Sequence, residues 1–241
     1  MNAPEANALG RRIADLLESG RVLEAHSLLS PVLGERTPFR YLDRIGAAAG
    51  VAPLPATNRF LATIAAESTE GGWVIIGAVL GQQLQRDWIG AFARCRSMAV
   101  AADVWYGADI LGERLPGPAL LSDLVRSLPL LSPWRSDDNR WVRRMVGVAV
   151  HFWAKRTRGA SEHVAQARGL LAFLEPMFGE REMDATKGVG WGLKTLGRYY
   201  PDLMAEWLPL QVGRPHRALM LRKALTYLPE EQRQRIRRTA R

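Results

Sequence analysis

The sequence predicts an all-α protein built from packed pairs of helices. Apolar residues recur at helical spacing along nearly the whole chain, and this period is the main signal for amphipathic helices. Runs that alternate Val, Ile and Thr between hairpin turns, which would indicate strands, are missing from the sequence. The links between helical segments are short, and short links favour side-by-side packing of consecutive helices.

The helices can be assigned in order from their apolar stripes and from the residues at their ends. They are expected at 6–19, 22–33, 41–49, 56–67, 71–86, 88–99, 102–113, 118–130, 137–156, 161–178, 185–199, 202–212 and 215–227. Residues that favour caps or breaks mark many of these ends. Gly20, Gly34 and Gly179 stand at C-terminal ends, Ser161 and Asp137 at N-caps, Pro118 in a first turn, and Pro201 just after Tyr200. The arginine-rich tail at 230–241 lacks an apolar face of its own and is expected to be a frayed terminal helix.

Helix pairs of this size are typical of HEAT-like solenoids. A hydrophobic share of 47% in 241 residues is enough for one continuous core, and no domain boundary stands out. We therefore expect a single domain over 1–241, a HEAT-like helical repeat solenoid of antiparallel helix pairs with a concave basic surface. Because the sequence has no strict period, a globular helical bundle is the alternative.

Several classes of site are excluded by composition. Cys95 is the only cysteine, so neither an intramolecular disulfide nor a cysteine-rich zinc site can form, and we expect this thiol to be buried in a helix. The four histidines are scattered along the chain, which predicts no metal site. The chain begins without a basic and apolar leader, and no window reaches the roughly 18 apolar residues of a membrane span. We expect a cytoplasmic protein without metal, cofactor or membrane contact.

The chain is strongly basic, with a formal charge of +9 that comes mostly from arginine. Guanidinium groups bind phosphate through two parallel hydrogen bonds, so a polyanion is the expected partner. Arginine-rich composition also arises in genomes of high GC content, so charge alone leaves this open.

A tryptophan and an aspartate lie four residues apart in the helix expected at 102–113. Helical spacing places Val104, Ala108 and Leu111 on the buried stripe, and Trp105 and Asp109 together on a neighbouring face. An aromatic plane thus stands beside a carboxylate, which a plain core does not require. The alternative is a half-buried tryptophan over a solvated carboxylate.

The helix expected at 137–156 begins with several arginines. Val142, Met145, Val146, Ala149 and Phe152 form its predicted buried stripe. Trp141 and Arg144 then share the flank, and Arg140 and Arg143 point further outward. Cations near a helix start oppose the helix dipole, so a bound anion would relieve them. A solvated charged face is the alternative.

The helix expected at 185–199 carries a tryptophan among cations. Its buried stripe is predicted to be Val189, Leu193, Leu196 and Tyr200, which leaves Trp191 between Lys187, Lys194 and Arg198. Gly188, Gly190 and Gly192 each destabilise a helix interior by about 1 kcal/mol. A ligand or a neighbouring helix is therefore expected to approach this backbone closely.

Taken in order, these three segments resemble the AlkD-like DNA glycosylases, a HEAT-repeat family of alkylation repair enzymes. Trp105 and Asp109 match the family's tryptophan and aspartate four apart. Asn139-Arg-Trp-Val-Arg-Arg144 is similar to its Asn-x-Trp-x-x-Arg helix start, and Lys187-Gly-Val-Gly-Trp191 to its Lys-Ala-x-Gly-Trp helix. The resemblance covers about 71–210. The chain departs from the family pattern at Lys194 and Thr195, where Arg and Glu are usual, and at Val104, where a second tryptophan is common.

The resemblance implies a monofunctional glycosylase that releases cationic N3- or N7-alkylated purines from double-stranded DNA, acting as a monomer. It implies lesion contacts for Trp105 and Trp191 and stabilisation of positive charge on the sugar by Asp109. The implied DNA-binding residues are Arg144, Arg143, Lys187, Lys194, Arg198 and Trp141. Two alternatives stay open: a non-catalytic DNA-binding relative, and a solenoid that binds proteins, which predicts scattered positive charge.

Overall fold

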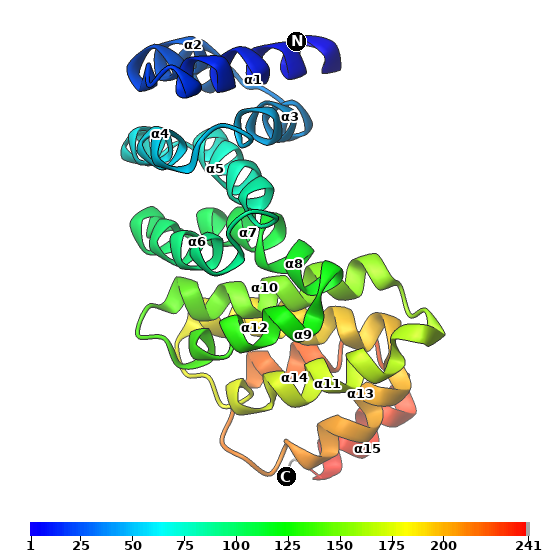
Figure 1. Cartoon of the computed structure of the whole chain (residues 1–241). Coiled ribbons are helices and arrows are strands. Elements are labelled where there is room, and N and C mark those ends of the chain that lie inside the picture. The colour runs from blue at the N-terminus through cyan, green and yellow to red at the C-terminus, as the bar shows by residue number, and fades with distance from the viewer. Residues whose placement is uncertain (240–241) are drawn as a thin grey trace. The chain divides into compact units, whose positions relative to one another are not determined.

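The computed structural model describes residues 1–239, and these contain helices and no strand (Figure 1). The predicted all-α fold is therefore confirmed. The chain forms two compact units, Met1–Leu115 and Pro116–Arg241, which are described separately. The expectation of a single domain stays a prediction.

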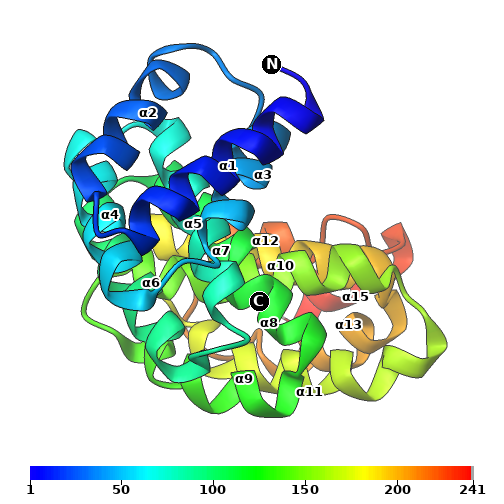
Figure 2. The ribbon, with the colours of Figure 1, turned by 45° about the horizontal axis from the view of Figure 1, so that its top comes forward.

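The first unit stacks its helices in two rows. Its helices are α1 Ala3–Glu18, α2 Val22–Gly34, α3 Phe39–Ala49, α4 Leu54–Glu67, α5 Glu70–Gln83, α6 Trp88–Ala102 and α7 Trp105–Arg114. The odd-numbered helices α1, α3, α5 and α7 pack in succession, and α2, α4 and α6 form the second row (Figures 1 and 2). This is the stacking of helix pairs that the sequence predicts.

Arginine side chains connect separate segments of the first unit by hydrogen bonds. Arg114 at the end of α7 donates two hydrogen bonds to Asp43 of α3, with N···O distances of 2.6 and 3.2 Å. Arg86 donates to the carbonyl oxygens of Gly50, Val51 and Ala52, which follow α3. These two arginines of the first unit therefore stabilise its fold.

The second unit repeats the two-row arrangement with shorter outer helices. Its elements are α8 Pro116–Ser122, α9 Leu124–Leu131, η1 Pro133–Ser136, α10 Arg140–Thr157, η2 Ser161–His163, α11 Val164–Leu174, η3 Glu175–Met177, α12 Met183–Tyr199, α13 Pro201–Trp207, η4 Leu208–Leu210, α14 Ala218–Ala224 and α15 Glu230–Thr239. Helices α8, α10, α12 and α14 pack in succession, while α11 packs on α13. Helices α10 and α12 make the most extensive contact in the unit.

Glycines allow α10 and α12 to meet backbone to backbone. A Cβ on Gly188 would lie 2.5 Å from the Arg144 carbonyl oxygen, and one on Gly147 would lie 2.2 Å from the Gly188 carbonyl oxygen. Neither helix can yield without moving its main chain. The close neighbour expected for this glycine-rich segment is therefore another helix.

Several helix boundaries differ from the sequence-based expectation, and three of the differences lie at short polar residues. Asp123 splits the helix expected at 118–130, because its side chain caps α9 by accepting from the Arg126 N–H. Asp103 takes a left-handed conformation and ends α6, so α7 begins only at Trp105. Asn139, rather than Asp137, is the N-cap of α10. The tail is also anchored better than predicted, because Ile236 of α15 is fully buried.

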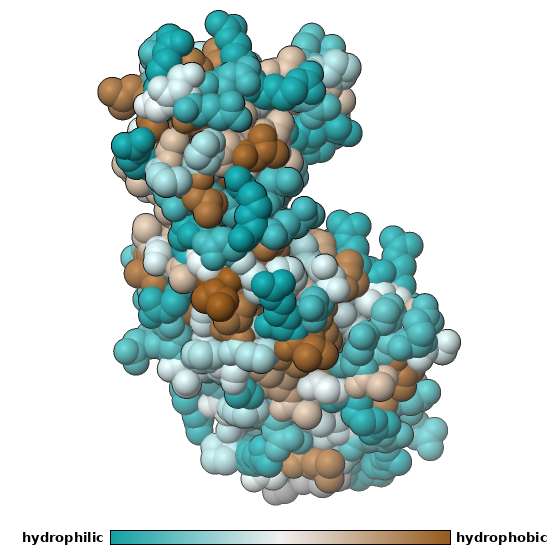
Figure 3. Space-filling model, in the orientation of Figure 1, coloured by the Kyte–Doolittle hydropathy of each residue, from teal (hydrophilic) through white to brown (hydrophobic). Residues whose placement is uncertain are grey.

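Burial and the grouping of side chains limit the kinds of site that the described residues can form. Cys95 is fully buried in α6, as predicted, and burial raises the pKa of its thiol. Among residues 1–239, no helix is long and apolar enough to cross a bilayer, and no group of three metal-binding side chains occurs. On the face drawn in Figure 3, hydrophobic residues form separate small patches among hydrophilic ones.

Candidate nucleic-acid interface

Trp105 and Asp109 lie one turn apart at the start of α7. Ala108 and Leu111 of this helix are fully buried, and Trp105 is 56% exposed, while Asp109 is half-buried. The indole of Trp105 meets the Tyr106 ring edge to face, at a centroid distance of 5.7 Å. A tryptophan so open to solvent contributes little to the core, so it is available to a ligand.

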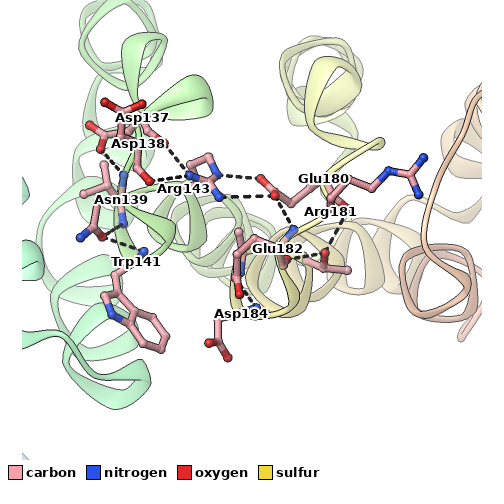
Figure 4. Close-up of polar contacts among 12 residues, drawn as sticks. Asp137, Asp138, Asn139, Trp141, Arg143, Glu180, Arg181, Glu182 and Asp184 are labelled. Carbon is pink, nitrogen blue, oxygen red and sulfur yellow. Dashed lines mark hydrogen bonds and ion pairs between the residues drawn. The ribbon is translucent and has the colours of Figure 1, made fainter.

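Asparagine and aspartate caps build the start of α10 (Figure 4). The Asn139 side chain accepts hydrogen bonds from the N–H groups of Trp141, at 2.9 Å, and Val142, at 3.3 Å. Asp137 in turn accepts from the Asn139 N–H at 2.9 Å. These bonds satisfy N–H groups in the first turn of α10 that have no partner within the helix. The protein's own side chains therefore occupy the helix start at which the sequence suggested a bound anion.

Arg143 is committed to the protein itself. Its guanidinium donates to both carboxylate oxygens of Glu180, at 2.7 and 3.4 Å, and to the carbonyl oxygens of Asp137 and Asp138 (Figure 4). The sequence analysis placed Arg143 outward as a DNA-binding residue. We correct this position, because two of the bonds join the start of α10 to Glu180 before α12 and two hold the residues before α10. We propose a structural role for Arg143 in place of DNA binding.

Trp141 also differs from its expected role. The ring is only 5% exposed, and the Arg140 guanidinium lies over it at 4.7 Å from the centroid. A covered, buried ring offers little surface to DNA, so we no longer propose Trp141 as a DNA-binding residue.

Arg144 is held in a fixed position between α10 and α12. It is 7% exposed, and its Nη1 donates to the Asp184 carbonyl oxygen at 3.1 Å. The Asp184 carboxylate also lies 3.4 Å from the Lys187 ammonium. Arg144 is therefore a pre-positioned cation and not a freely moving surface side chain.

Trp191 stacks on a histidine from the neighbouring helix. The ring centroids of Trp191 and His151 are 3.8 Å apart, with an interplanar angle of 23°. His151 Nδ1 lies 2.7 Å from the Thr195 hydroxyl, which donates to the Trp191 carbonyl oxygen at 3.0 Å. Burial, followed by repulsion from Lys155, lowers the pKa of His151 to about 4. At neutral pH, Trp191 thus rests on an uncharged imidazole.

Lys223 of α14 is a central basic residue that the sequence analysis missed. Its side chain crosses Gly190 of α12, where an added Cβ would lie 2.6 Å from the lysine Cδ. Burial lowers the Lys223 pKa most, followed by repulsion from neighbouring cations. Those cations are Lys194, Arg144, Arg222 and Lys187, in decreasing order of effect. The structure thus gathers three of the predicted DNA-binding residues around one unpredicted lysine.

These features belong to two separate parts of the chain. Trp105 and Asp109 lie in the first compact unit, whereas Arg144, Trp191 and Lys223 lie in the second. That they form one site stays a prediction.

Comparison with known proteins decides the family. The family model described as DNA alkylation repair enzyme matches residues 68–228, which is more than half of the chain. The chain belongs to the DNA alkylation repair enzyme family. The match includes every predicted site residue and extends beyond Lys223, and it confirms the family that the three motifs indicated.

A solved structure of an alkylation repair enzyme shares the fold. It is a Pseudomonas fluorescens alkylpurine DNA glycosylase, AlkC, bound to DNA containing an abasic site analogue. The TM-score is 0.55 at 16% sequence identity, and the match covers 91% of this chain and 62% of that one. The chain thus spans 62% of the length of this glycosylase, and the likeness shows a HEAT-type fold. No curated protein matches the sequence.

Proposed function

We propose that this member of the DNA alkylation repair enzyme family is a monofunctional DNA glycosylase. Its substrate would be double-stranded DNA with a cationic N3- or N7-alkylated purine, and its reaction the hydrolysis of the N-glycosidic bond. The observation that carries the proposal is the exposed Trp105 one turn before the half-buried Asp109, in a chain of this family.

Departure of the alkylated base needs no general acid. A purine alkylated at N3 or N7 already carries positive charge, so it leaves as a neutral base. Positive charge develops on the deoxyribose, as in the oxocarbenium-like state of glycoside hydrolysis. Asp109 would stabilise that charge and orient the attacking water. Trp105 and Trp191 would present electron-rich ring faces to the cationic lesion.

The basic cluster around Lys223 would hold the DNA backbone. Arg144, Lys187 and Lys194 all raise the positive potential at Lys223, and Arg198 lies one turn beyond Lys194 on α12. Grouped cations of this kind neutralise phosphates and make affinity strongly dependent on salt. A solenoid that binds proteins predicts scattered charge instead, so this grouping favours DNA as the partner.

A glycosylase assay on DNA with N7-methylguanine tests the proposal. Substitution Asp109→Asn should slow base release by roughly 10²- to 10³-fold, which is typical for loss of a preorganised charge-stabilising group. Asp103→Asn is the matched control, because Asp103 is exposed and asparagine tolerates its left-handed backbone.

Two results would count against this assignment. Undiminished release by Asp109→Asn would remove the proposed role of the carboxylate. An intact protein that binds DNA without releasing any base would instead be the non-catalytic relative.

A further inference from the structure

The second unit contains a small pocket that joins residues of the proposed DNA interface to residues that the proposed function does not use. Its volume is about 150 Å³. Helix α10 contributes His151 and Lys155, and α12 contributes Trp191, Lys194 and Arg198. Tyr227, from the segment after α14, closes another side. With Tyr199 of α12, three cations and four rings, one of them the His151 imidazole, thus line one cavity.

The positive charge of this pocket is not balanced by the protein. No carboxylate lines it, and within residues 1–239 none of Lys155, Lys194 and Arg198 forms an ion pair. This differs from Arg143, which pairs with Glu180 at 2.7 Å. Three cations gathered without a counter-charge repel one another unless an anion joins them.

Aromatic contacts fix two of the cations in place. The Lys194 ammonium lies 5.4 Å and the Arg198 guanidinium 5.3 Å from the centroid of the Tyr227 ring. Such cation–π contacts hold a charged group without neutralising it. The cations are therefore positioned for a ligand before it binds.

The size of the cavity indicates the class of ligand. Pockets for drug-sized molecules usually measure about 300 to 1,000 Å³, which is well above the value here. Since a water molecule occupies about 30 Å³ in the liquid, the cavity has room for a group of a few heavy atoms. A phosphate group suits this volume and charge better than a purine base does.

We propose that this pocket binds one backbone phosphate of DNA, next to the nucleotide that Trp191 contacts. The inference rests on the proposed function in taking damaged DNA as the partner. It adds Lys155 and Tyr227 to the interface, and it assigns Lys155, Lys194 and Arg198 to a single phosphate.

Salt dependence of binding distinguishes one shared phosphate from three separate ones. Each phosphate contact contributes about 0.9 to the slope of log affinity against log salt. Between 50 and 200 mM salt, one contact therefore changes the affinity ratio by about 3.5-fold, and three contacts by about 40-fold. The triple variant K155Q/K194Q/R198Q should lower this ratio by about 3.5-fold on a duplex with an abasic-site analogue. A loss near 40-fold would overturn the single-phosphate assignment.

Neutral methylphosphonates, placed one at a time along the same duplex, locate the phosphate. We expect one position next to the abasic site to weaken binding of the wild-type protein and to have no further effect on the triple variant. Equal sensitivity of both proteins at every position would contradict the proposal, as would a lack of salt-dependent DNA binding. Arg156→Gln is the matched control, because this exposed neighbour of Lys155 stacks on Phe152 outside the pocket.

The measurement stays informative whatever the outcome of the glycosylase assay. This experiment measures binding to a product analogue. A protein that releases no base can therefore still show the one methylphosphonate position at which binding is weakened. The melting temperature of the triple variant should stay close to the wild-type value, because the lost cation–π contacts with Tyr227 and the relieved repulsion between the cations oppose each other. Weaker DNA binding by this variant is then not a result of unfolding.

Discussion

Trp191 owes its place among cations to its neighbour on α10. His151 stacks on one face of the indole at 3.8 Å, and the half-buried Trp191 also lines the basic pocket. The contact also fixes the direction of the indole, because both side chains extend from helices that meet through glycines. Packing on His151 therefore explains part of the position of Trp191, which the sequence alone did not explain.

The pKa of His151 predicts how stability changes with pH. Because this pKa falls from 6.5 to about 4 on folding, the unfolded chain takes up the proton more readily, and acid favours unfolding as pH drops from 6.5 to about 4. The loss should reach roughly 2 to 3 kcal/mol. Urea unfolding at pH 7 and pH 4.5 measures it. His151→Asn should flatten this pH dependence, and an unchanged profile would contradict the buried neutral imidazole.

Two cations of the predicted set should behave in opposite ways. Arg143→Gln removes the cation that is paired with Glu180 and should lower the free energy of unfolding by roughly 1 to 3 kcal/mol, with no change in the salt slope of DNA binding. Lys187→Gln should lower the slope by about 0.9 and change stability by less than about 0.5 kcal/mol. Paired denaturation and binding titrations check both effects, and a reduced slope for Arg143→Gln would restore it as a phosphate ligand.

At the scale of the elements, the packing of α10 on α12 depends on glycine. Gly188→Ala should destabilise the protein by about 1 to 3 kcal/mol, because the new methyl group meets the Arg144 backbone. Gly169→Ala is the matched control at an exposed position of α11, where no atom lies within 4 Å of an added Cβ. It should stabilise the protein by about 0.5 to 1 kcal/mol. Thermal melts of both variants test the pair, and two shifts of the same sign would contradict the close approach.

The sequence was sufficient to locate nearly every helix, because apolar periodicity is a local signal. The main errors fall where a short polar residue redirects the chain. Asp103, Asp123 and Asn139 each have side chains that suit either a helix interior or its end. Which one they choose depends on the packing of later elements, so the breaks before Trp105 and at Asp123 were not predictable from spacing.

At the scale of the whole molecule, motifs predicted α12 as a cationic face but not the residues that complete it. Lys155, Lys223 and Tyr227 join that face from α10, α14 and the segment after α14. Their sequence separation from Trp191 carries no information about distance. Arg143 and Trp141 were misplaced for a related reason, because Glu180 and Arg140 cover them only in the folded chain.

Coupling between the two compact units tests whether they share one reaction site. If Asp109 and Trp191 act on the same transition state, Asp109→Asn and Trp191→Phe should not be additive. We expect a coupling energy of about 0.5 to 3 kcal/mol in a double-mutant cycle on single-turnover base release. Rate losses that simply multiply would show that the two residues act independently.

The most direct test of the central claim is the product formed from a duplex with a single N7-methylguanine. The account predicts free methylated base in amounts equal to the abasic sites, in a strand that breaks only after treatment with hot alkali. No free base above the spontaneous rate would contradict the glycosylase assignment. Strand breakage without alkali would contradict the monofunctional reaction. The amine of Lys223 would then be a candidate nucleophile for strand cleavage.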